Sequence, residues 1–148
     1  MTEDIGVLKD LVDTLDNGHK GFADAADKLE GDGHPELAQQ FRSYSEQRAR
    51  LSSELRDLAA ARGEKLDTGG TVPGAMHRGW LAVKDAIHGS SPEGVLDAAE
   101  QGEDHAVSEF KTALDKDLSP DVAAAVSRQY EEVRATHDAV RSLRDRAS

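Results

Sequence analysis

Residues 91–120 read SPEGVLDAAEQGEDHAVSEFKTALDKDLSP, and this stretch contains the start of one helix and the start of the next. Ser91-Pro92-Glu93 and Ser119-Pro120-Asp121 each combine a hydroxyl N-cap, a proline at the first helical position and a carboxylate near the positive helix end. Between them, small and apolar residues recur at alternating spacings of three and four, which is typical of a helix that packs along one face. The stretch predicts helices over 92–117 and 120–146.

The rest of the chain is divided in the same way, because Gly and Pro cluster at 31–35, 69–74 and 89–92. Long helices are expected over 3–30 and 35–62, and a shorter one over 73–88. Each long helix has a seam, meaning the row of positions at three-four spacing that should face its neighbours. The four seams run through Leu8, Leu11, Leu15, Gly18, Phe22, Ala25 and Leu29; Leu37, Phe41, Tyr44, Arg48, Leu51, Leu55 and Leu58; Leu96, Ala99, Glu103, Ala106, Phe110 and Ala113; and Val122, Val126, Gln129, Val133, Thr136, Val140 and Leu143.

Turn lengths set the expected connectivity of these helices. Short turns join the first two and the last two into hairpins, whereas a long crossover with its own short helix joins the hairpins. We therefore expect one all-α domain over 1–148, an antiparallel four-helix bundle with ferritin-like connectivity. The apolar stripe of the short helix would pack on this bundle as a plug, with a candidate pocket beneath Trp80; it comprises Met76, Trp80, Val83 and Ile87.

Composition restricts the classes of partner. The net charge of −11 and the pI of about 4.9 give a negative field that repels nucleic-acid phosphate and anionic lipid. The absence of cysteine excludes disulfides, thiol nucleophiles and thiolate metal sites. The first residues lack the basic start and the apolar stretch of a signal peptide, and no segment is apolar over a membrane's width. We expect a cytoplasmic protein without nucleic-acid or membrane partners.

Several polar residues stand at or beside the seams, where apolar residues are expected. Arg48 and Glu103 each lie about fifteen residues from their hairpin turns, or roughly 22 Å along helices of about 40 Å, so both fall near the bundle midplane. Gly18 lies opposite Arg48 and would leave room for its side chain. The predicted buried polar layer contains Arg48, Glu103, Gln129, His137 and His19.

Two interpretations of this layer remain. In the first, Arg48 and Glu103 form a buried charge-assisted pair, helped by Gln129, that fixes helix register. In the second, Glu103 and His137 bind one ion of iron, manganese or zinc, aided by His19 or Asp16, although a guanidinium at the same level disfavours a cation. The pairs Asp16–His19 and Asp85–His88 are expected on the surface, as are Glu100 and Asp104.

A di-iron centre of the ferritin type needs Glu-x-x-His motifs on two helices, and this sequence contains none. Ala49 stands three residues after Glu46, and Arg134 stands three residues before His137. Nucleophile–base constellations, phosphate-binding glycine loops and nucleotide motifs are missing as well. The sequence does not decide whether the protein is an enzyme, but it favours a protein without enzymatic activity.

Short motifs in the chain resemble a bacterial family of unknown function, described as four-helix-bundle proteins and grouped with the ferritin-like superfamily. The resemblance covers nearly the whole chain and rests on Asp16-Asn17-Gly18 with Phe22, His77-Arg78-Gly79-Trp80, Gly102-Glu103-Asp104, His137-Asp138 and Leu143-Arg144-Asp145. It implies a fold more than an activity. We expect a non-catalytic bundle with a stress-associated or interaction role; the alternative is a metal-binding bundle with a reduced carboxylate/histidine site. Homo-oligomerisation through an outer helix face is a third hypothesis.

Overall fold

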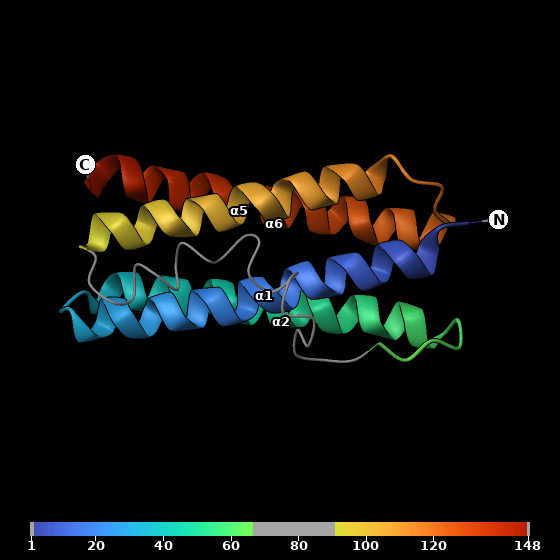
Figure 1. Cartoon of the computed structure of the whole chain (residues 1–148), viewed down its shortest axis with the longest axis horizontal. Helices are drawn as coiled ribbons and strands as arrows, with labels where there is room; N and C mark the ends of the chain where they lie inside the picture. The colour runs from blue at the N-terminus through green and yellow to red at the C-terminus, as the bar shows by residue number, and fades with distance from the viewer. Residues whose placement is uncertain (1, 67–90, 148) are drawn as a thin grey trace.

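The computed structural model describes residues 2–66 and 91–147 of the chain (Figure 1). These ranges contain four helices and no strand, as the sequence predicts: α1 (Asp4–Gly31), α2 (Pro35–Ala60), α5 (Pro92–Leu114) and α6 (Pro120–Ala147). The short helix expected over 73–88, its pocket beneath Trp80 and the Asp85–His88 pair lie outside the described residues.

The ends of the helices follow local chemistry. Ser91 caps α5, because its Oγ accepts a hydrogen bond from the Gly94 amide at 3.3 Å. α5 ends at Leu114, three residues before the predicted end, because the Asp115 and Lys116 amides turn back to carbonyls only three residues away. α2 ends at Ala60, two residues early. It is followed by Gly63 at φ +82°, a left-handed conformation that glycine adopts without steric cost.

Contacts among the helices join α1 to α2 and α5 to α6 most extensively, and α1 also packs on α5 (Figure 1). Among these neighbouring pairs, α2 and α6 pack together least. Polar links join these two: Thr136 Oγ1 donates to Gln47 Oε1 at 3.0 Å, Arg50 Nη2 lies 3.4 Å from Glu132 Oε1, and Arg128 pairs with Glu54. The α2–α6 side is therefore a polar interface, whereas the α1–α2 and α5–α6 pairs are apolar inside.

One end of the structure is closed by hydrogen bonds between segments far apart in sequence. We call Asp4, Arg62, Ser119 and Asp121 the end cluster. Asp4 accepts from the Ser119 amide at 2.8 Å, from Ser119 Oγ at 2.6 Å and from Arg62 Nε at 3.2 Å. Arg62 Nη2 also donates to Asp121 Oδ1 at 2.6 Å. The start of α1, the end of α2 and the α5–α6 turn therefore meet at this end.

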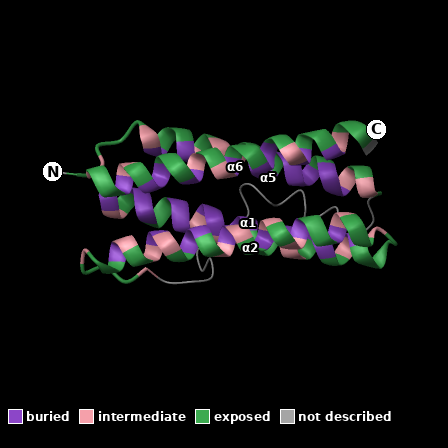
Figure 2. Ribbon diagram, turned by 180° about the vertical axis from the view of Figure 1, so that it is seen from behind, coloured by how far each residue is buried: buried purple, intermediate pink, exposed green. Residues whose placement is uncertain are grey.

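Buried residues recur along all four helices (Figure 2), and the apolar ones form two clusters. One contains Phe22 and Phe41, whose rings meet edge to face with centroids 5.4 Å apart, and Tyr44 packs against both. The other contains Leu8, Leu11, Leu15, Leu51, Leu55, Phe110, Val126 and Val133. Burial of each such side chain contributes about 1.5–3 kcal/mol to folding. Along α2, Arg48 stands between Phe41 of the first cluster and Leu51 of the second, so polar groups separate the two clusters.

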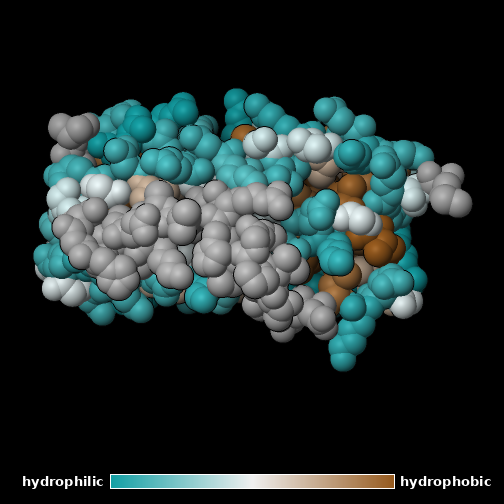
Figure 3. Space-filling view, viewed as in Figure 1, coloured by the Kyte–Doolittle hydropathy of each residue, from teal (hydrophilic) through white to brown (hydrophobic). Residues whose placement is uncertain are grey.

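The surface drawn in Figure 3 is mostly hydrophilic where residues are described, and apolar side chains gather toward the end at which the N-terminus lies. This fits a chain with 32% charged residues. Within the described ranges, the helices are too polar or too short to cross a bilayer.

Candidate functional site

Arg48 on α2 and Glu103 on α5 meet between the two apolar clusters, and we call them the midplane pair. Arg48 Nη2 donates to Glu103 Oε2 at 2.5 Å, and neither side chain is exposed to solvent. Both residues hold seam positions, so the helix pattern that buries leucine elsewhere buries these charges. A charge in this position needs its partner, because removal of one leaves the other desolvated and unpaired.

Packing around Arg48 explains how so long a side chain fits between helices. A Cβ added at Gly18 on α1 would lie 3.3 Å from both Cγ and Nη1 of Arg48, so only glycine leaves this space without displacing the side chain. The guanidinium Cζ lies 5.4 Å from the centre of the Phe22 ring, within the range of a cation–π contact. Arg48 is thus packed by α1 as well as paired with α5.

Burial outweighs ion pairing in setting the pKa of Glu103. Burial raises the pKa of Glu103 above its ordinary value, although Arg48 and, more weakly, His137 act in the opposite direction. Arg48 Nη1, Glu103 Oε1 and Gln129 Oε1 are buried without a hydrogen-bond partner in the described part of the chain. The pair therefore joins α2 to α5 through one strong hydrogen bond rather than through a saturated network.

Gln129 is fully buried on α6, but it does not hydrogen bond to the midplane pair. Its Nε2 donates to the Leu51 carbonyl at 3.2 Å and to Glu54 Oε1 at 2.7 Å. Gln129 therefore ties α6 to α2 instead of assisting Glu103. Near this interface an open polar groove of about 470 Å³ lies over α2 and α6, lined by Ser43, Tyr44, Glu46, Gln47, Arg50 and Thr136.

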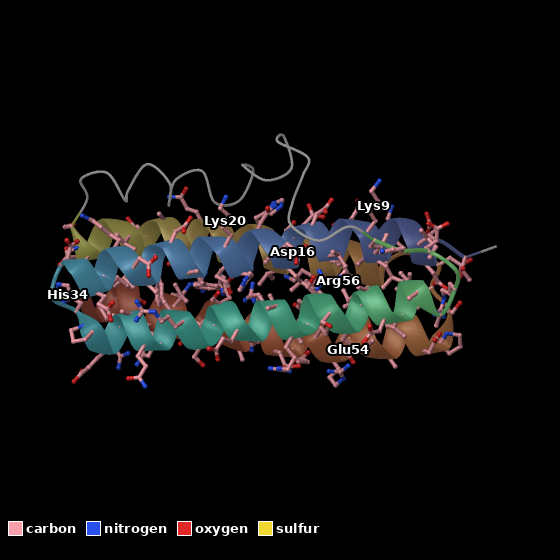
Figure 4. All side chains as sticks on the ribbon, turned by 90° about the horizontal axis from the view of Figure 1, so that it is seen from below. Lys9, Asp16, Lys20, His34, Glu54 and Arg56 are labelled. Carbon is pink, nitrogen blue, oxygen red and sulfur yellow. The ribbon has the colours of Figure 1, made fainter. Side chains whose placement is uncertain are left out.

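His19 and Asp16 lie elsewhere. His19 is exposed and does not join the buried layer in which the sequence analysis placed it; its Nδ1 lies 2.8 Å from Ser45 Oγ and 2.9 Å from the Ser45 carbonyl. Asp16 accepts from Ser52 Oγ at 2.6 Å and faces Arg56, whose Nη1 is 3.5 Å away (Figure 4). Both residues flank the seam position held by Gly18 instead of occupying it. Their side chains therefore contact polar groups of α2 and do not enter the core. The four residues predicted as metal ligands therefore do not converge.

His137 does meet carboxylates, but not that of Glu103. Its Nε2 lies 2.5 Å from Asp104 Oδ1, and its Nδ1 lies 3.2 Å from Asp138 Oδ1. Ligand atoms of Glu100, Asp104 and His137 all lie within 4.8 Å of one another. We call these three residues the α5–α6 cluster. Its geometry suits a cation: two carboxylates and an imidazole from neighbouring helices surround one point.

Glu100 was expected on the surface, and this expectation is wrong, because only 6% of the residue is exposed. Arg141 Nε lies 3.3 Å from its Oε1, and Arg144 Nη1 lies 2.6 Å from its Oε2. The two guanidinium groups cover the carboxylate and neutralise it. The signal was present in the sequence: arginines spaced by three on α6 can face acids spaced by three or four on α5. Asp104 is exposed, as predicted.

The fold and site define an all-α protein of paired helices with a buried ion pair in its core. More narrowly, the chain belongs to the family described as Domain of unknown function (DUF2383), whose model matches residues 3–116. This match spans α1, α2 and α5. The comparison with curated proteins gave no match.

Proposed function

We propose that the chain is a single-domain, antiparallel, ferritin-like bundle of the cytoplasm that is not an enzyme and acts through its surfaces, in a stress-associated or interaction role. The end cluster supports the arrangement, because it gathers the start of α1, the end of α2 and the α5–α6 turn at one end. The helices of each hairpin then run in opposite directions, and α5 begins at the opposite end of the bundle from the one at which α2 ends.

The midplane pair is the observation that carries the non-catalytic role. In ferritin-like enzymes, carboxylates and imidazoles from four helices converge in mid-bundle to hold two metal ions. Here a guanidinium lies against the buried Glu103 carboxylate at 2.5 Å. Because Arg48 is fully buried and cannot turn toward solvent, it repels a divalent cation and occupies the carboxylate oxygen that would bind it. The core is built as a structural ion pair, so recognition is left to the surface.

Oxidation of ferrous iron tests this proposal. With the full chain and Fe²⁺ in air, we expect the rate of Fe³⁺ formation to equal that of protein-free buffer. The Glu103→Gln variant should behave identically. Iron oxidation that exceeds the buffer rate and falls in Glu103→Gln would overturn the proposal, because it would place a working metal centre at the midplane.

Self-association is the surface interaction that we propose for this bundle, as many helical bundles form symmetric oligomers. The largely hydrophilic surface and the apolar side chains near the N-terminal end offer distinct faces for such contact (Figure 3). Multi-angle light scattering across a concentration series should give a mass above the 15.9 kDa of one chain. A mass that stays at one chain at every concentration would count against it.

A metal-binding bundle is the second candidate, and the α5–α6 cluster is the observation that favours it. This role does not need a midplane centre. A bundle with an inert core can still hold an ion between two of its helices, so the two candidates are compatible.

A further inference from the structure

We propose that the α5–α6 cluster binds one divalent ion of the zinc class, with Glu100 and Asp104 supplying carboxylate oxygens and His137 supplying Nε2. The site would join α5 to α6 beside the midplane pair rather than within it. The proposal rests on the second candidate function, a metal-binding role, and is independent of the first.

Spacing of the ligand atoms is close to that of an occupied site. Ligands about 2.1 Å from a Zn²⁺ ion lie about 3–4 Å from one another. The atoms of this cluster already lie within 4.8 Å of one another, and His137 Nε2 is 2.5 Å from Asp104 Oδ1. Small rotations of exposed Asp104 therefore complete the geometry without movement of either helix.

The second nitrogen of His137 is positioned as it is in metal sites. Histidines that bind metals usually donate their other ring N–H to a carboxylate, which fixes the tautomer and raises ligand basicity. His137 Nδ1 lies 3.2 Å from Asp138 Oδ1, so the imidazole can donate there. Its Nε2 then presents a lone pair to Asp104. At 2.5 Å the two atoms share a proton, and a metal ion would replace this proton and hold the atoms about 3–4 Å apart.

The three ligands of the site differ in how far they are exposed to solvent. His137 and Glu100 are 8% and 6% exposed, whereas the Asp104 side chain is 56% exposed. Two ligands are therefore held by packing and the third lies at the solvent edge, where an ion can enter and keep water at its remaining positions. One imidazole with two carboxylates selects zinc and similar first-row ions over magnesium and calcium, which prefer oxygen ligands alone.

Arg141 and Arg144 compete with the ion for Glu100. Their side chains are 52% and 35% exposed, so either can turn toward solvent when a cation arrives. Arg144 also lies 3.6 Å from Asp97 and 3.0 Å from Asp145, which can retain it at the surface. The competition predicts that Arg144→Gln binds the ion more tightly than the natural chain does.

Calorimetric titration of the full chain with ZnCl₂ tests the proposal. We expect one Zn²⁺ per chain, at least tenfold weaker binding in His137→Ala and Asp104→Asn, about tenfold weaker binding in Asp138→Asn, and tighter binding in Arg144→Gln. Zinc should also raise the melting temperature of the natural chain but not that of His137→Ala. Asp104→Asn alters an exposed side chain, so its result stands even if His137→Ala folds poorly.

Two variants serve as controls. His105 on α5 lies 3.8 Å from Glu109 Oε1 and pairs with a single carboxylate, so His105→Ala should bind zinc normally. Glu103→Gln should also bind normally, which separates this site from the midplane pair. The proposal is overturned if the natural chain binds no zinc, if Asp104→Asn binds as well as the natural chain, or if His105→Ala is the variant that loses binding.

Discussion

The midplane pair and the end cluster use the same two groups, a carboxylate and a guanidinium, in opposite surroundings. Within the described residues, Glu103 has one hydrogen-bond donor, Arg48, and its side chain is not exposed to solvent. Asp4 accepts hydrogen bonds from the Ser119 amide and hydroxyl, from the Thr2 side chain and from Arg62, whose own side chain is partly exposed. The number of donors, rather than the presence of an arginine, separates the two regions.

The pKa values of the two carboxyl groups move in opposite directions as a result. Burial raises the pKa of Glu103, and one guanidinium does not offset it. Burial would also raise the pKa of Asp4, but the hydrogen bonds from Ser119 and Arg62 outweigh it and lower the pKa. The end cluster therefore stabilises a charged carboxylate, whereas the core tolerates one. A buried pair of this kind fixes which helices meet at which level more than it adds stability.

Loss of Arg48 should give the largest effect. We expect Arg48→Ala to lower the free energy of unfolding by about 3 kcal/mol or more, because Glu103 loses the guanidinium that donates to it and a cavity opens beside Gly18. Urea denaturation followed by circular dichroism measures the change.

Arg50→Ala is the matched control for this variant. The Arg50 side chain is 64% exposed and pairs with Glu132, so its loss should change stability by less than about 0.5 kcal/mol. The double variant Arg48→Met, Glu103→Leu should recover most of the loss, since an apolar pair needs no partner for a charge. A near-natural stability of Arg48→Ala itself would mean that the pair is not buried.

Loss of Asp4 should give an intermediate effect. We expect Asp4→Ala to cost about 2 kcal/mol at neutral pH, because the hydrogen bonds to a charged acceptor are lost. The lowered pKa of Asp4 means that its contribution is fully present above the unfolded value near 3.8 and is lost as pH falls through the folded pKa. The difference between the natural chain and Asp4→Ala should therefore shrink in acid.

Asp10→Ala, which removes an exposed charge from the same helix, serves as the control for Asp4→Ala. Melting temperatures between pH 7 and pH 2 measure both variants. A gap between Asp4→Ala and the natural chain that stays constant into strong acid would show that the hydrogen bonds do not depend on the charge.

Changes at glycine should give the smallest effects. Alanine is favoured over glycine in a helix by up to about 1 kcal/mol. Gly6 has nothing within 4 Å of an added Cβ, so Gly6→Ala should gain part of this energy. At Gly18 the added carbon lies 3.3 Å from Arg48, whose side chain must move to make room, and the gain should be offset. Chemical denaturation compares the two variants. Equal stabilisation by both would indicate that Arg48 is loosely held.

The helices could be predicted from the sequence because their signals are local. Ser-Pro pairs fixed the starts of α5 and α6 at Pro92 and Pro120. The ends of α2 and α5 lay two and three residues earlier than predicted, because tight turns replaced the last helical turn. Composition near a helix end does not distinguish an α-helical turn from such a turn.

The site was only partly predictable. Seam position identified Arg48 and Glu103, because a charged residue in the apolar row of a helix is buried and needs a partner of opposite charge. It misplaced His19 and Glu100, each one position beyond a seam residue. At such positions burial depends on what the neighbouring helix offers: Ser45 leaves His19 open to solvent, while Arg141 and Arg144 cover Glu100. A single helix pattern does not contain that information.

The end cluster also bears on how the chain folds. Asp4 and Ser119 are 115 positions apart, so their hydrogen bonds close one of the longest loops in the chain. The α1–α2 and α5–α6 pairs can each form from local contacts, but this closure must wait until the two pairs dock, because its entropic cost has to be met by contacts already made. Substitutions at Asp4 should therefore accelerate unfolding and leave the folding rate nearly unchanged. The hydrogen bonds of Asp4, the first carboxylate of α1, therefore form late in folding, when the helices have already packed.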